Sequence, residues 1–182
     1  MTYQRKGGVQ MEFEDLKYRL DDMESDSDYI FEIVNKIVKD CCENLDKYVE
    51  YVKDRMSDAN CELTNQELDD IIITIPTLLY FVSVQQEKLG IKHDISKLNR
   101  NAVFNKEYLN APGTAGAKKA QAESKVINDD IASIIFVRAY NTIKSKVDAA
   151  TEILQSAKKV VSRRISEFEL SKVSVDRNKA VF

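Results

Sequence analysis

Tryptophan is absent from this 182-residue chain, and glycine and proline are scarce, with five and two residues respectively. Turn-rich folds such as β-sandwiches and β-barrels depend on these two residues at their tight turns. Their scarcity argues against such folds and favours an all-α protein. The hydrophobic fraction of 43% is large enough for a packed core, and the charged fraction of 31% is typical of long helices that face water.

Long hydrophobic runs are missing as well. The longest unbroken apolar stretch is a few residues around Ile71–Ile73, so no segment is expected to span a membrane. The first ten residues, MTYQRKGGVQ, hold no apolar run and lack the pattern of a secretion signal. These absences predict a cytoplasmic protein.

The residue types that carry most enzyme chemistry are few. The single histidine, His93, precedes Asp94, but nothing nearby in the sequence completes a Ser–His–Asp arrangement. Cys41, Cys42 and Cys61 form no CxxC pair, and their spacing does not resemble a zinc site. Neighbouring helical positions point about 100° apart, so only one of Cys41 and Cys42 can join a buried face. We expect no enzymatic activity, no metal and no cofactor.

The net charge of −3 conceals a division along the chain. Residues 1–76 hold 19 acidic and 9 basic side chains, a net of −10, whereas residues 77–182 hold 11 acidic and 18 basic ones, a net of +7. Two interpretations stay open. Either the basic part contacts nucleic acid, or basic helices pair with acidic helices inside the protein or its oligomer.

The N-terminal pattern predicts two helical segments after a flexible arm over residues 1–10. The first segment begins at Met11, where apolar residues recur three and four apart. The stretch Glu24–Asp28 is expected to interrupt it, because serine and aspartate favour helix starts. A second segment then continues to about Ser57.

Thr64 and Glu67 have the spacing of a capping box, which predicts the start of the next helix. Its buried face contains leucines, isoleucines and a valine at helical spacing, and we expect Phe81 to widen that face. Pro76 should kink or restart the helix, because proline lacks an amide hydrogen. Gly90 should end it in the left-handed conformation that glycine tolerates.

A shorter amphipathic helix is expected after Gly90, and Asn110–Gly116 is the clearest loop of the chain. A last, long helix is predicted from about Ala117 to Leu170, with fraying beyond it. We therefore expect an acidic N-terminal helical region over residues 1–63. Residues 64–182 would form a helical core with a long basic C-terminal helix.

An apolar stripe runs along this last helix in alternating steps of four and three residues, the spacing of a coiled coil. Such a stripe faces a partner over many turns, so the fold expected is an elongated helical bundle with a coiled-coil-like C-terminal helix. We expect the stripe to mediate homo-oligomerisation. Its residues are Phe136, Tyr140, Ile143, Val147, Ala150, Leu154, Ala157 and Val161.

Basic side chains lie beside the stripe and at the start of the same helix. Lysines and arginines there can contact phosphates, as can the free amides of a helix start. The alternatives are solvated lysines and ion pairs with acidic helices. The residues expected to contact nucleic acid are Lys118, Lys119, Lys144, Lys158, Lys159, Arg163 and Arg164.

The segments ESKVINDD (residues 123–130) and ILQSAKKVVSRR (residues 153–164) resemble the UvsY-type recombination mediators of tailed phages. Members of that family are small all-helical proteins whose last helix has an acid-rich start and a leucine–lysine–arginine end. The loop that follows Tyr108 also has a counterpart there. In residue pattern the resemblance covers about residues 123–166, and Lys158, Lys159, Arg163 and Arg164 match the basic end of the family helix.

The resemblance implies a ring-like homo-oligomer that binds single-stranded DNA in the host-cell cytoplasm. It further implies partners: a single-strand-binding protein that it helps displace and a RecA-like recombinase that it helps load, in phage DNA recombination, repair and replication. The alternative hypothesis is a phage structural or assembly protein that forms a helical homo-oligomer without binding nucleic acid.

Overall fold

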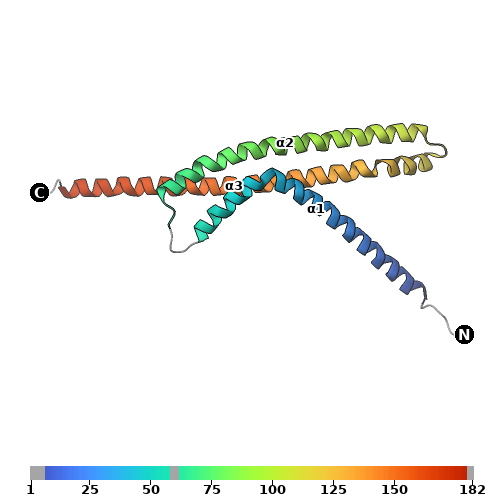
Figure 1. Ribbon diagram of the computed structural model, residues 1–182, viewed down its shortest axis with the longest axis horizontal. Helices are drawn as coiled ribbons and strands as arrows, with labels where there is room; N and C mark the ends of the chain where they lie inside the picture. Colours follow the sequence, from blue (N-terminus) through green and yellow to red (C-terminus); the bar gives the residue numbers. More distant parts are fainter. Residues whose placement is uncertain (1–6, 58–61, 180–182) are drawn as a thin grey trace.

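The computed structural model describes residues 7–57 and 62–179, and within them it contains three α-helices and no strand. α1 spans Gly7–Ser57, α2 spans Asn65–Asn110 and α3 spans Ala115–Lys179. α2 and α3 run antiparallel, side by side, and the C-terminal half of α1 packs across both of them (Figure 1). The predicted all-α helical bundle with a long C-terminal helix is confirmed.

Buried apolar side chains of all three helices form one core. The C-terminal half of α1 contributes to this core, and α2 and α3 contribute along much of their shared length. The buried members of the core are Val34, Val38, Cys42, Leu45 and Val52 of α1, Leu68, Ile71, Ile75, Val82 and Leu89 of α2, and Ala139, Ile143, Ala150, Leu154 and Ala157 of α3. Cys42 is buried and Cys41 only half-buried, as their divergent helical positions predicted, and Cys61 lies outside the described residues.

The start of α2 follows its sequence signal. The Thr64 hydroxyl accepts a hydrogen bond from the Glu67 amide at 3.2 Å, and the Glu67 carboxylate accepts one from the Thr64 amide at 2.8 Å. The predicted capping box is confirmed. α1 ends at Ser57 as expected, and the connection between Asn110 and Ala115 falls within the predicted loop.

Two expected helix interruptions are wrong, those at Glu24–Asp28 and Gly90, and at Pro76 the helix does not restart. α1 continues through Glu24–Asp28, where every side chain is exposed, so the serines and aspartates are solvated without breaking the helix. α2 passes through Pro76 without a restart, and it passes through Gly90, which has no positive φ. Packing of α2 along α3 outweighs the modest helix penalty of a glycine. The expected shorter helix after Gly90 is thus the C-terminal half of α2.

The ends of the chain also differ from expectation. Helix α1 begins at Gly7, so only residues 1–6 of the predicted arm lie outside it, and these are outside the described residues. Helix α3 continues beyond Leu170 to Lys179, where fraying had been expected. Both the N-terminal part of α1 and the C-terminal part of α3 extend past the three-helix region (Figure 1).

Candidate nucleic-acid interface

Three lysines of α3 form a row on its solvent side. Lys144 and Lys158 are two heptads apart and therefore share a side of the helix, about 21 Å from each other, and Lys159 is adjacent. All three are exposed, and none forms an ion pair within the described residues. We call Lys144, Lys158 and Lys159 the lysine row. Exposed ammonium groups without an ion pair can contact phosphates of one strand.

Arg163 and Arg164, which follow the row, are paired differently. The Arg163 guanidinium lies 3.6 Å from Glu167 one turn along α3, and both groups are exposed, so this pair is weak and exchangeable. Arg164 instead reaches the start of α2. Its guanidinium donates to the Leu63 carbonyl at 2.7 Å and to the Asn65 side chain at 2.8 Å.

These contacts give Arg164 a structural role that its sequence position did not reveal. It holds the connection between α1 and α2 against α3, where Glu62 adds an ion pair at 3.9 Å. A phosphate could engage this guanidinium only after those bonds were broken. Of Arg163 and Arg164, Arg164 is therefore the weaker candidate for contact with nucleic acid.

The start of α3 offers less to a phosphate than its sequence suggested. Gly113 adopts φ 102°, and Thr114 then caps the helix: its carbonyl accepts from the Lys118 amide at 2.9 Å, and its hydroxyl faces the Ala117 amide at 3.5 Å. Lys119 lies 3.6 Å from Glu123. The amides of Ala117 and Lys118 are thus already bonded, and the half-buried Lys118 side chain is left as the cation without an ion pair here.

Some of the basic side chains form ion pairs with acidic side chains of other helices. Lys146 of α3 donates to Asp46 of α1 at 2.7 Å, and Arg100 of α2 lies 3.1 Å from Asp130 of α3. The pair of Lys146 with Asp46 and the contact of Arg164 with Glu62 join the basic and acidic parts of the chain, whereas the pair of Arg100 with Asp130 lies within the basic part. The internal pairing of basic and acidic helices is therefore present in part, and contact of the lysine row with nucleic acid stays a prediction.

The stripe that we expected to mediate oligomerisation packs within the chain. Ile143, Ala150, Leu154 and Ala157 are buried in the core, and the other four residues lie half-buried against it. Those four are Phe136, Tyr140, Val147 and Val161. Contacts between copies through this stripe stay a prediction, and they would require its side chains to leave α1 and α2.

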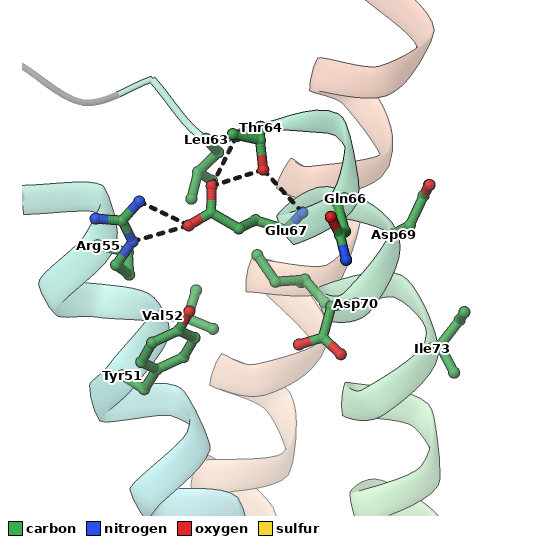
Figure 2. A pocket seen from close by; sticks show the side chains of 11 residues that line it. Tyr51, Val52, Arg55, Leu63, Thr64, Gln66, Glu67, Asp69, Asp70 and Ile73 are labelled. Atoms are coloured by element: carbon green, nitrogen blue, oxygen red, sulfur yellow. Dashed lines mark hydrogen bonds and ion pairs between the residues drawn. The ribbon is translucent and has the colours of Figure 1, made fainter.

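A pocket of about 600 Å³ lies where α1 meets the start of α2 (Figure 2). Arg55 of α1 donates to the Glu67 carboxylate at 2.6 and 2.9 Å, and that carboxylate also completes the capping box. The hydrogen bond from the Thr64 backbone and then those from Arg55 lower the Glu67 pKa to about 2. Glu67 is therefore ionised at neutral pH and ties two helices together.

A second bond between α1 and α2 lies next to this pocket. The Tyr48 hydroxyl donates to Asp70 at 2.6 Å, and burial followed by this bond raises the Tyr48 pKa to about 12. Near pH 7, Glu67 therefore stays ionised and Tyr48 stays protonated. The polar groups of this pocket serve to join helices.

His93 has a partner that sequence spacing could not reveal. Its Nδ1 lies 3.1 Å from the Ser133 hydroxyl and 3.2 Å from the Ser133 carbonyl, across the interface between α2 and α3. The bond joins two half-buried positions 40 residues apart and fits a contact between helices. In the described residues, no cluster of three or more histidine, cysteine, aspartate or glutamate side chains is placed to hold a metal ion.

Within residues 7–57 and 62–179, no helix contains an 18-residue stretch apolar enough to cross a membrane. No protein-family model, curated protein or solved structure matches this chain.

Proposed function

We propose that this protein binds single-stranded DNA through α3 and acts, without catalysis of its own, as a recombination mediator. The observation that carries the proposal is the lysine row: Lys144, Lys158 and Lys159 are exposed on one helix and have no acidic partner in the described residues. Phosphate contacts by lysine supply affinity that does not depend on base sequence. The mediator role follows the resemblance in the same helix, around residues 153–164.

The expected preference for a single strand over a duplex follows from the resemblance and not from the lysine row itself. Lysine contacts phosphate charge and not base edges, so we expect little sequence preference. Phe104 and Tyr108 of α2 stack on each other with ring centroids 6.0 Å apart, and Arg100 lies over Phe104. Because these rings are half-buried, we assign DNA contact to the lysines and not to base stacking.

Fluorescence anisotropy with labelled single- and double-stranded oligonucleotides tests the proposal at several salt concentrations. We expect tighter binding to the single strand and affinity that falls steeply as salt rises. Replacing the whole row in Lys144→Ala/Lys158→Ala/Lys159→Ala should weaken binding. It should also lower the slope of log K against log salt by about 2, since each lost phosphate contact accounts for about 0.7 on single strands.

A matched control removes the same charge from another helix. Lys36, Lys39 and Lys53 are exposed on α1, so Lys36→Ala/Lys39→Ala/Lys53→Ala should keep the wild-type salt slope. Equal effects of the two triple variants would show that only net charge matters. Absence of binding at low salt would contradict the proposal outright.

A second candidate function is helical assembly without nucleic acid. The observation that favours it is the large number of exposed apolar side chains on α2, which are characteristic of protein contacts. The oligonucleotide titration separates the two candidates, because an assembly protein has no affinity for DNA that the lysine row could control. The proposed mediator also assembles into an oligomer, as the resemblance implies.

A further inference from the structure

Helix α2 has a second apolar face that is exposed among the described residues. Seven large apolar side chains are between 44% and 69% exposed there: Ile73, Tyr80, Phe81, Val84, Ile91, Ile95 and Leu98. At about 100° per residue, all of them fall within an arc of about 100°. The buried face of α2, which includes Ile75, Val82 and Leu89, lies on the opposite side of the helix.

The other helices leave this face open. α3 packs against the buried face of α2. α1 approaches the second face at two places: near Ile73, which lines the pocket of Figure 2 together with Tyr51, and at the edge where Phe81 and Leu45 line a small pocket of about 130 Å³. In Figure 1 the side of α2 that faces away from α3 forms an outer edge of the molecule. A helix that is apolar on two opposite faces is expected to bury both.

The size of the face fits a protein partner. An aromatic side chain presents about 150–250 Å², so Tyr80 and Phe81, at 67% and 63% exposure, contribute about 200–300 Å². Five aliphatic side chains add to this. The total exceeds the few hundred Å² that a solitary protein usually leaves open, and it approaches the area of about 800 Å² that each partner buries in a stable complex.

The arrangement of the face is that of a coiled-coil seam. Steps of three and four residues alternate without exception through Phe81, Val84, Lys88, Ile91, Ile95, Leu98 and Ala102, and all seven are exposed. We call these seven residues the outer seam. Because its period matches that of a partner helix of the same kind, we propose that the outer seam pairs with the outer seam of a second copy of this chain, in parallel and in register.

Charges beside the seam select the parallel orientation. In a parallel pair, the position before one seam residue faces the position five residues further along the partner helix. Glu87 then faces Lys92 of the second copy, twice by symmetry. In the antiparallel arrangement with full overlap, Glu87 would instead face Asp94 of the second copy, so acid would oppose acid.

One seam residue limits the strength of the pairing. Lys88 occupies a central position, and in the parallel arrangement the two Lys88 side chains meet. A single lysine in such a seam fixes register and oligomeric state while it reduces stability. Lys88→Ile should therefore tighten the pairing, which a merely solvated lysine on a helix surface would not do.

The inference names the contact surface for the assembly in the proposed function, but it does not require DNA binding, so each can fail alone. Sedimentation equilibrium of the full chain measures its self-association. We expect a wild-type dimer or larger assembly, and a dissociation constant raised at least about a hundredfold by Ile91→Asp/Leu98→Asp, because two unpaired carboxylates would be buried. The control Ile127→Asp places one such carboxylate on an exposed apolar site of α3 and should leave association unchanged.

Orientation is tested by cysteine crosslinking. Under mild oxidation, Lys88→Cys should form a disulfide with the same residue of a second copy, and mass spectrometry of the crosslinked peptide separates it from bonds through native cysteines. A monomeric wild type, or assembly that survives Ile91→Asp/Leu98→Asp, would overturn the inference. Association that depends on the seam but yields no bond at position 88 would overturn the parallel register.

Discussion

Gly90 provides a test of α2 in which the sequence and the structure predict effects of opposite sign. As the glycine that ends a helix, it would adopt a positive φ, and an alanine there would cost about 1 kcal/mol or more. In the structure Gly90 lies inside a continuous helix without a positive φ. A β-carbon at this position would lie 3.7 Å from the Tyr140 ring, which is ordinary van der Waals contact.

We therefore expect Gly90→Ala to stabilise the protein. Alanine exceeds glycine in helix propensity by about 0.8–1 kcal/mol, and it reduces the entropy of the unfolded chain. For a protein of this size, such a gain raises Tm by about 2–4 °C. Thermal and urea unfolding, followed by circular dichroism at one fixed protein concentration, measure the change.

Gly113 supplies the matched comparison. Its φ of 102° lies in the left-handed region, so Gly113→Ala should lower the free energy of unfolding by about 1 kcal/mol or more. If Gly90→Ala destabilised the protein as much as Gly113→Ala does, α2 would have to be broken at Gly90. The continuous heptad of the outer seam across that position would then be lost as well.

The remaining predictions concern the junction of the three helices. Arg164→Ala should lower the free energy of unfolding by about 1–3 kcal/mol, because its charged hydrogen bonds to the α1–α2 connection are lost. Arg163→Ala, which removes an exposed pair, should change it by less than about 0.5 kcal/mol in the same urea titration. Because the Glu67 pKa is lowered to about 2, its contribution is complete above its ordinary value of 4.5 and is lost as the pH falls towards 2. Glu67→Gln should therefore flatten the pH dependence of Tm in that window, whereas Lys144→Ala should not.

Signals within a few residues of each other predicted local structure well. The capping box required only Thr64 and Glu67, and the loop was marked by Pro112 and Gly113. Predictions from single helix-breaking residues were less successful. The expected break at Gly90 was wrong, because it depends on a local preference of only about 1 kcal/mol. The long packing of α2 on α3 overrides such a preference, and this packing cannot be seen in a window of a few residues.

Periodicity predicted that a helix face is covered, but not which helix covers it. The stripe through Ile143 and Leu154 meets α1 and α2 of the same chain, although its spacing equally suits a second copy. Phe81 was assigned to the buried face of α2, yet it is 63% exposed. Both sides of α2 carry apolar residues. The sequence pattern therefore did not show which of them are buried against α3 and which are exposed on the opposite face.

The placement of the two surfaces allows assembly and DNA binding to occur together. The outer seam lies on the side of α2 away from α3, so pairing through it leaves the lysine row uncovered. The proposed pair has two such rows, so a strand long enough to reach both would bind more tightly without any new interaction. Ile91→Asp/Leu98→Asp should thus weaken binding to long oligonucleotides more than to short ones, whereas loss of the lysine row should weaken both. Such a difference is the result expected when assembly through the seam adds a second DNA contact.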